Sequence, residues 1–200
     1  MFSSLFGKPE QRNDFELSTE DKRQLLTIAR SALELYIKEN SFPMYKDAEI
    51  NPANQDKAGA FVTLTKKGEL RGCIGHIDSE NPLYKTIQSL TVASATKDHR
   101  FKSVNQDELS DIEIEISVLT PMKKISSIDQ IEIGRHGIYI KKGYQTGTFL
   151  PQVASETDWT VEEFLGKCAR DKAHIGWDGW KDADIYTYEA LKFSESDFKN

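Results

Sequence analysis

The sequence predicts an α+β fold in which a largely antiparallel β-sheet packs against flanking helices. Helical and strand-like patterns interleave without regular βαβ alternation, and the later strand-like segments are short and separated by glycine-containing turns. The 200 residues suffice for one domain with an elaboration, since a typical domain holds about 150 residues. With 38% hydrophobic and 29% charged residues, the composition excludes the disordered, collagen-like and membrane classes.

Three segments show the three- and four-residue spacing of apolar side chains that is typical of amphipathic helices. Each begins at residues that favour a helix N-terminus. The predicted helices run from Ser18 or Thr19 to Asn40, from Leu83 to Lys97 behind Asn81 and Pro82, and onward from the capping box of Thr160 and Glu163.

Strand patterns occur in several short segments, and the clearest is IEIEISVL, whose alternation leaves Glu113, Glu115 and Ser117 on one face. That face is expected to be wet or to line a site. FVTLT and LRGCIGHI form a predicted β-hairpin with Gly68 in its turn. The predicted strands are 61–65, 70–77, 112–119, 131–134, 136–143, 146–153 and 185–191.

The chain divides into a leader, one domain and a tail. Residues 1–17 show no period and are expected to form a mobile leader. Residues 18–193 form the predicted domain, and 194–200 are a short polar tail. Within the domain, residues 41–57 have the Pro, Asn and Asp content of a long loop, which is often a binding element.

Charge and apolar content limit the partners and the cellular location that we expect for the protein. A net charge of −6 weighs against binding nucleic acid through its phosphates, although a local basic patch would permit it. No apolar run approaches the roughly 18 residues that a membrane helix needs, and the first residues lack the features of a signal peptide. We therefore expect a cytoplasmic protein that does not enter a membrane.

The segment LRGCIG is the strongest candidate for chemistry. Gly72 and Gly75 bracket Cys73 inside a predicted strand, where glycine indicates a bulge or a close backbone approach. With a period of two, Arg71, Cys73 and Gly75 share one face, so that a cation lies near the thiol and favours the thiolate. In the alternative interpretation, Cys73 is a small buried hydrophobe and Arg71 is a surface charge.

ELRGCIGHI, followed in order by PLYKTI, KDHRF, IEISVLTP, RHGIYI and TFLPQVA, resembles the AMMECR domain family, which includes the AmmeMemoRadiSam system proteins A. The chain departs from the family pattern at His99 and over residues 172–180. The resemblance implies a two-lobed domain with a larger lobe of sheet and helices and a smaller β lobe. It implies no settled activity, but it implies a Memo-like protein and a radical-SAM protein as partners.

The leading hypothesis is an enzyme, or a component of one, that acts in a cleft at LRGCIG. Cys73 would be the nucleophile or attachment point, Arg71 would recognise an anionic group of a small substrate, and His136 or His76 would be the base. Further candidates for substrate binding, matched by the resemblance or by position, are Gly72, Gly75, Asp98, Arg100 and Gln152.

Each candidate also has a structural interpretation. Asp98 and Arg100 are expected to form a loop salt bridge, and Cys168 lies on the apolar stripe of its helix, which predicts core packing. No HExxH or CxxC spacing is present, so we expect neither a metal nor a cofactor. The rival function is a non-catalytic module that presents LRGCIG and the 41–57 loop to a protein or to RNA.

Overall fold

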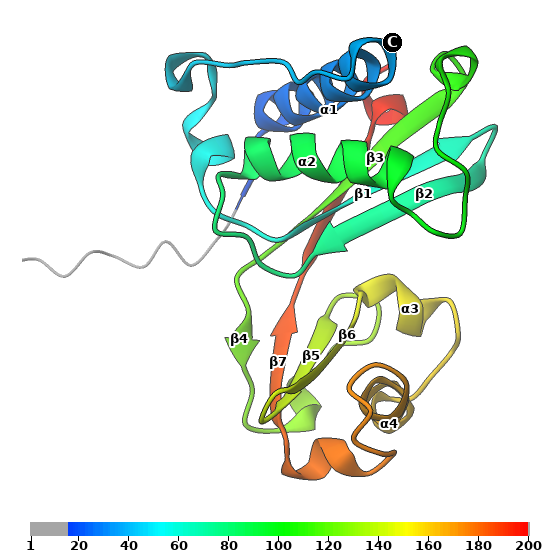
Figure 1. The fold of residues 1–200 in the computed structure, drawn as a ribbon. Helices are drawn as coiled ribbons and strands as arrows, with labels where there is room; N and C mark the ends of the chain where they lie inside the picture. Colours follow the sequence, from blue (N-terminus) through cyan, green and yellow to red (C-terminus); the bar gives the residue numbers. More distant parts are fainter. Residues whose placement is uncertain (1–15, 200) are drawn as a thin grey trace, which may run out of the picture.

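The computed structural model describes residues 16–199, which form two lobes (Figure 1). The α+β class is confirmed by four α-helices and two four-stranded antiparallel sheets in this part of the chain. The helices are α1 Thr19–Glu39, α2 Leu83–Thr96, α3 Pro151–Ser155 and α4 Val161–Asp171. The strands are β1 Ala60–Lys66, β2 Glu69–His76, β3 Ile112–Leu119, β4 Lys123–Lys124, β5 Gly137–Lys142, β6 Gln145–Phe149, β7 Asp184–Tyr188 and β8 Ala190–Ser194.

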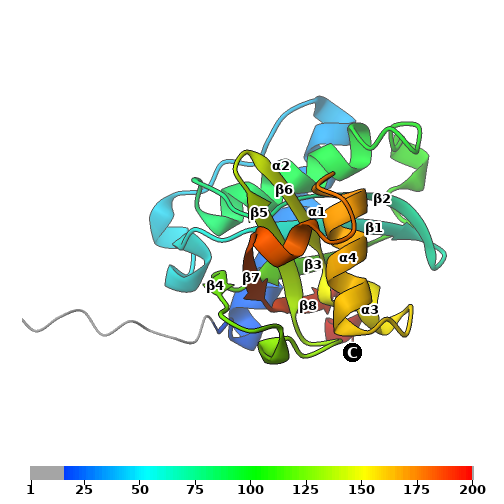
Figure 2. The same cartoon turned by 90° about the horizontal axis from the view of Figure 1, so that it is seen from below.

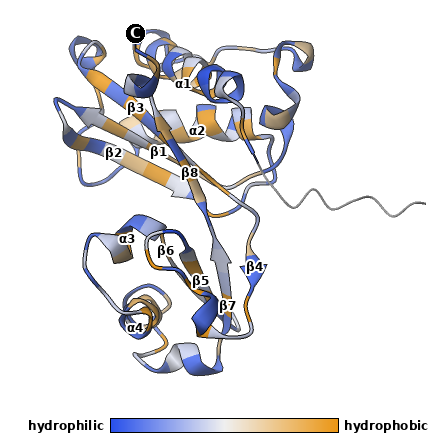
Figure 3. Cartoon of the chain, turned by 180° about the vertical axis from the view of Figure 1, so that it is seen from behind, coloured by the Kyte–Doolittle hydropathy of each residue, from blue (hydrophilic) through white to orange (hydrophobic). Residues whose placement is uncertain are grey.

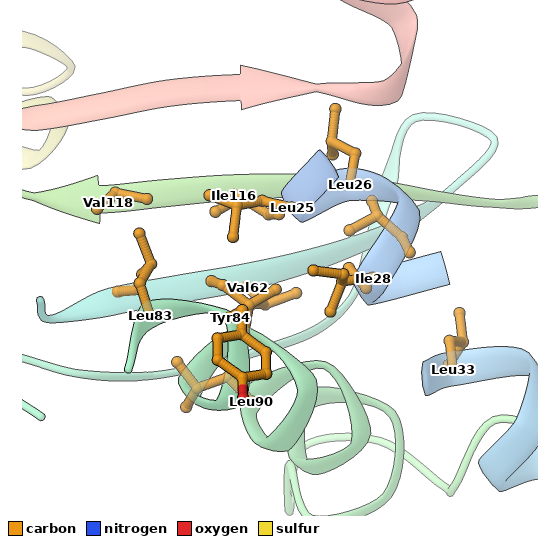
Figure 4. Packing of buried hydrophobic residues seen from close by; sticks show 14 of the residues in the cluster. Leu25, Leu26, Ile28, Leu33, Val62, Leu83, Tyr84, Leu90, Ile116 and Val118 are labelled. Carbon is orange, nitrogen blue, oxygen red and sulfur yellow. The ribbon is translucent and has the colours of Figure 1, made fainter. Parts of the chain in front are cut away.

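The larger lobe is a sheet of order β2-β1-β3-β8 with α1 and α2 packed on one face (Figure 1). Alternate residues of β1 and β3 point toward the helices, so that Val62 and Ile116 pair across the strands and are fully buried. Figure 4 shows these side chains meeting those of α1 and α2 in a single core. The other face of this sheet, called the outer face below, is turned toward the smaller lobe.

Helix α1 forms where the sequence predicts it. Ser18 and Asp21 make a reciprocal capping box, and Asn40 ends the helix in the left-handed conformation with φ of 53°. The buried residues Leu25, Ile28, Ala29, Ala32 and Leu33 recur at three- and four-residue spacing. Burial of this stripe against the sheet stabilises the helix more than its intrinsic propensity does.

The smaller lobe is a sheet of order β4-β7-β5-β6 with α4 packed against it (Figure 2). Its core is separate from that of the larger lobe and includes Ile138, Ile140, Phe164, Leu165 and Cys168. The rings of Phe149 and Phe164 stack with centroids 5.8 Å apart. Burial of Cys168 agrees with its predicted place on the apolar stripe of its helix.

The chain passes between the lobes twice, at neighbouring positions (Figure 3). It leaves the larger lobe after Leu119 of β3 and returns at Ala190 of β8, and these two residues pair across the sheet. At the crossing, the Thr120 N–H donates to the Glu189 carbonyl at 2.9 Å, and the Glu189 N–H donates to Thr120 Oγ1 at 2.8 Å.

Three predicted strands differ from the structure. In place of the strand expected over 131–134, residues 131 and 132 are irregular and residues 133–135 form a turn in which Gly134 has φ of 84°. The strand expected over 146–153 ends at Phe149, because Pro151 has a fixed φ suited to a first helical turn and begins α3. The strand expected over 185–191 is interrupted at Glu189, which separates β7 and β8 in different sheets.

The ends of the chain are only partly described. Residues 1–15 of the expected leader lie outside the described residues, whereas Leu17 is buried in the larger core. In the expected tail, Ser194 ends β8, and Glu195 accepts a hydrogen bond from Arg30 Nε at 2.8 Å. Among residues 16–199, no helix has both the length and the apolar content that crossing a membrane requires.

Candidate functional site

Cys73 lies on the outer face of the larger sheet, and Gly75 shares that face with it, as the two-residue period of β2 predicts. It pairs with Thr63 of β1, and the Thr63 hydroxyl donates a hydrogen bond to Cys73 Sγ at 3.3 Å. The thiol is half-buried, and both cysteines of the chain are free.

The two glycines beside Cys73 are both required by close contacts, on opposite faces of β2. A Cβ at Gly72 would lie 2.1 Å from the carbonyl oxygen of Ser94, where α2 crosses the strand. A Cβ at Gly75 would lie 2.1 Å from the ring of Phe61, which covers that position on the outer face. The glycines therefore allow a helix and an aromatic ring to approach the strand on either side of the cysteine.

Asp98 and Arg100 hold the backbone of Cys73 at the edge of the sheet. The Cys73 N–H donates to Asp98 Oδ2 at 2.9 Å, and Arg100 Nη2 lies 3.5 Å from the Cys73 carbonyl oxygen. Arg100 also donates to Asp98 through Nε at 2.9 Å and Nη2 at 2.7 Å, which confirms the expected salt bridge. These bonds from Arg100, together with the Cys73 N–H, hold the pKa of Asp98 well below its usual range.

The charge of Arg100 also lies near Cys73. Its pKa is raised above the ordinary value chiefly by the hydrogen bonds to Asp98, with a smaller contribution from the negative charge of a Cys73 thiolate. The Arg100 side chain is 57% exposed, so it remains accessible to a solute at this edge of the sheet.

Ser94 of α2 links the two strands of the hairpin. Its hydroxyl donates to the Val62 carbonyl at 2.8 Å and accepts from the Ile74 N–H at 2.9 Å. Val62 and Ile74 face each other across β1 and β2. The helix therefore fixes the strand next to the cysteine through a side chain as well as through apolar packing.

Arg71 lies on the same strand but is already paired. Its Nε and Nη2 donate to the two carboxylate oxygens of Glu108 at 3.1 and 3.0 Å, and Nη1 donates to the Lys102 carbonyl at 2.8 Å. The Arg71 side chain is only 15% exposed. The hydrogen bonds from Arg71, supported by Lys66 at 3.0 Å, lower the pKa of Glu108 to about 2.

The candidate bases do not contact the thiol. His76 ends β2 with an exposed side chain, and His136 lies in the smaller lobe, where its Nδ1 accepts from the Glu132 N–H at 3.0 Å. Across residues 16–199, no side-chain hydrogen bond joins either histidine to Cys73. Gln152 lies on α3 of the smaller lobe, and its Oε1 is buried with no hydrogen-bond partner among the described residues.

The structure therefore brings Cys73, Asp98 and Arg100 together and leaves the histidines and Gln152 elsewhere. Three contributors were not found from the sequence: Thr63, Ser94 and Glu108. A run of small residues in α2 signals close packing around Ser94, but nothing local marks Glu108.

A cavity of about 440 Å³ opens between the lobes beside this site. Phe61, one of its walls, pairs with Gly75 and lies two residues before Thr63 on the same face of β1. The larger lobe contributes Phe61 and Ile77 to its lining, and the smaller lobe contributes Tyr139, Thr146, Gly147, Thr148, Phe149, Leu150, Val153 and Lys172. Within the described part of the chain, no group of three His, Cys, Asp or Glu side chains is placed to hold a metal ion.

Fold and site together define a class of two-lobed α+β proteins in which an edge strand carries a cysteine between two closely packed glycines. The chain belongs to the AMMECR1 family, whose model matches residues 26–193. This match spans most of both lobes and confirms the family that the motifs indicated.

Two proteins and one solved structure represent what this chain is similar to. A protein of Methanosarcina mazei is 36% identical over 189 residues, which cover 90% of this chain and 94% of that protein. Protein MK0488 of Methanopyrus kandleri is 37% identical over 196 residues, covering 91% of this chain and 92% of its own. The crystal structure of the uncharacterized protein PH0010 from Pyrococcus horikoshii matches with a TM-score of 0.80 and 33% identity, over 90% of this chain and 93% of that one.

Proposed function

We propose that this AMMECR1-family chain is an enzyme component that carries out cysteine-dependent chemistry on a small anionic substrate at the outer face of β2. Cys73 is the proposed nucleophile or attachment point. The observation that carries the proposal is the setting of its sulfur, which accepts a hydrogen bond from Thr63 while Asp98 and Arg100 hold the backbone of the same residue.

This setting favours a reactive sulfur for electrostatic reasons. The thiolate is the nucleophilic form of cysteine, and a hydroxyl donor together with a nearby guanidinium stabilises negative charge on sulfur. Fixing the strand backbone on both sides of the residue also fixes the direction in which the sulfur points. Gly72 and Gly75 support this by allowing α2 and Phe61 to pack against the strand.

The two arginines are proposed to share the task of anion recognition. Arg100 is the more exposed, and its guanidinium is accessible from solvent while Asp98 orients it. Arg71 would act through its charge and not through a direct hydrogen bond to the substrate, because its donors already bind Glu108 and the Lys102 carbonyl. Gln152 is not included in this proposed site, because its amide oxygen is buried in the smaller lobe.

Proton transfer is assigned to His76 or His136. Neither ring contacts Cys73 Sγ, so the proton would pass through water or through the substrate. The resemblance of the chain to AmmeMemoRadiSam system proteins A supports a place for this chemistry beside a Memo-like and a radical-SAM protein.

Alkylation kinetics test the proposed reactivity of Cys73. The native protein is treated with iodoacetamide at pH 7, and each cysteine is quantified by mass spectrometry. Cys168 serves as an internal reference, because burial raises the pKa of its thiol to about 12 and its side chain is inaccessible. Cys73 is expected to react faster than the free thiol of glutathione.

Two variants then identify which side chains cause the reactivity of Cys73. Arg100→Ala and Thr63→Val are each expected to slow alkylation of Cys73 at least about threefold, because each removes a group that stabilises the thiolate. Arg170→Ala is the matched control, since Arg170 is an exposed arginine that pairs with Asp171 on α4. A wild-type rate equal to or below that of glutathione contradicts the proposal.

A second candidate, a protein-binding module, is favoured by one observation. In the loop over residues 41–57, Met44 is 95% exposed and Phe42 is 46% exposed, although both are large apolar side chains. If the chain acts only by binding a Memo-like protein, Met44→Asp abolishes co-purification, and Cys73→Ser preserves the activity of the complex. If it acts through Cys73, Cys73→Ser abolishes that activity and leaves co-purification intact.

A further inference from the structure

The cavity between the lobes has the size and composition of a small-molecule site. Its volume of about 440 Å³ is adequate, since ligand pockets typically have about 300–1,000 Å³. Its walls are mostly apolar, and both lobes contribute to them, through Phe61 and Ile77 on one side and Phe149, Leu150 and Val153 on the other. Such sites form preferentially where two structural units meet.

The aromatic walls favour a flat ligand. Phe149 already stacks on Phe164 with an interplanar angle of 12° and packs against Trp159 with centroids 5.9 Å apart. These contacts fix the orientation of the Phe149 ring, which also lines the cavity. Phe61 supplies an aromatic side chain from the larger sheet, and aromatic rings gain stability from stacked or edge contacts with a further ring.

Lys172 supplies the only charge among the residues that line the cavity. Its ammonium lies 5.5 Å from the centroid of the Phe149 ring, and no salt bridge within residues 16–199 involves it. The neighbouring acid, Asp171, is paired with Arg170. A cation without a carboxylate partner at the rim of an apolar cavity is complementary to an anion.

We infer that this cavity binds the flat, apolar body of an aromatic anion and that Lys172 binds its carboxylate, sulfonate or phosphate group. The link to catalysis rests on the proposed function of Cys73. Phe61 and Thr63 are two residues apart on one face of β1, a separation of about 7 Å along a strand. One end of a bound ligand therefore lies within reach of the sulfur that Thr63 contacts.

Binding is tested with a pair of fluorescent probes that differ in charge. 8-Anilinonaphthalene-1-sulfonate carries the aromatic body and an anionic group, whereas N-phenyl-1-naphthylamine has the same body without charge. The full chain is titrated with each probe while circular dichroism verifies that it stays folded. We expect one sulfonate probe per chain and weaker binding of the neutral probe.

Three variants locate the probe. Lys172→Gln is expected to weaken binding of the sulfonate about fivefold and to leave the neutral probe unaffected. Lys167→Gln is the matched control, because the Lys167 ammonium lies over the Trp159 ring outside the cavity lining. Thr146→Trp places a large ring in the cavity from an exposed strand position and is expected to abolish binding of both probes.

Each outcome bears on one part of the inference. No binding, several probes per chain, or binding unchanged by both Lys172→Gln and Thr146→Trp overturns the cavity assignment. Saturating sulfonate probe is expected to slow the alkylation of Cys73, and an unchanged rate overturns the link between cavity and sulfur. Cys73→Ser is expected to bind the probe normally, so failure of the cysteine chemistry is distinguishable from failure of the cavity.

Discussion

The carboxylate of Glu108 lies between two cations, Arg71 and Lys66, and this makes it a sensitive residue for acid stability. Its pKa in the folded protein is about 2, below the ordinary value of 4.5, because Arg71 donates two hydrogen bonds to it. A depressed pKa stabilises the fold at pH values above the ordinary one. That stabilisation is lost as the pH falls from 4.5 through 2.

Glu108→Gln is expected to lower the free energy of unfolding at pH 7 by about 1–3 kcal/mol, since Arg71 loses a charged acceptor. The variant should also lose less stability than the wild type between pH 4.5 and pH 2, the interval over which Glu108 becomes protonated. Urea denaturation across this range measures both effects. Glu34→Gln, which removes an exposed i,i+4 pair with Lys38, is the control. Equal pH dependence of the Glu108 variant and the wild type would contradict this account.

At the scale of single residues, the sequence predicted that Cys73 and Gly75 share a face of the strand, but not which side chains of other strands lie beside Cys73. Lys66 pairs with Glu69 across the turn, so counting back from the turn places Val62 opposite Cys73. The register shifts by one residue between Leu64 and Thr65, where Arg71 of β2 is left without a partner, and this brings Thr63 opposite Cys73 instead. The glycines beside Cys73 indicated a bulge or a close backbone approach, but they did not indicate which residue would be left without a partner.

Helix α2 packs directly against strand β2 at Gly72, and this contact requires the absence of a side chain there. A methyl group at this position would meet the Ser94 carbonyl oxygen at 2.1 Å, and this neighbour is backbone that cannot rotate away. Gly72→Ala is expected to destabilise the fold by about 1–3 kcal/mol or more, because α2 must shift away from the strand. Thermal unfolding measures this, with the exposed Leu70→Ala on the same strand as control. A melting temperature equal to that of the wild type would show that α2 moves freely.

The Ser94 hydroxyl stabilises the same contact through hydrogen bonds. Ser94→Ala removes one donor from the Val62 carbonyl and one acceptor from the Ile74 N–H, so we expect a loss of about 1–3 kcal/mol. Ser89→Ala removes a hydroxyl from the exposed face of α2 and is expected to be nearly neutral. Hydrogen exchange of the Ile74 amide provides a second readout, and faster exchange in the Ser94 variant alone is expected. Equal losses in the two variants would exclude a specific role for the Ser94 hydroxyl.

Among the elements, those with a long apolar period and a cap were predicted well. The N-cap of α1, the capping box of α4 and the alternation of β3 are strong local signals, and all three elements formed where expected. Helix α3 was mistaken for a strand because its five residues are too few to display a helical period. The division between β7 and β8 depends on which sheet each half joins, and a single apolar run does not encode that.

At the scale of the whole molecule, the length predicted one domain with an elaboration, the interleaved helix and strand patterns predicted the α+β class, and the resemblance added the two lobes. None of these observations on the sequence indicated a cavity between the two lobes. The cavity requires Phe61 and Lys172 to meet from segments more than a hundred residues apart, and only the relative placement of the lobes brings them together. The site is accordingly less predictable than the fold.

The pairing of Leu119 with Ala190 makes the smaller lobe an insertion into a β-hairpin. Residues 120–189 can then be replaced by an Asn-Gly turn, which suits a two-residue connection between paired antiparallel strands. The larger lobe has its own core. The shortened chain that lacks residues 120–189 is therefore expected to unfold cooperatively, at a lower temperature than the full chain. Loss of cooperative unfolding would mean that the larger sheet needs its partner lobe. If the shortened chain folds, the smaller lobe is a module that could be exchanged between relatives to alter what the cavity accepts without rebuilding the strand that carries Cys73.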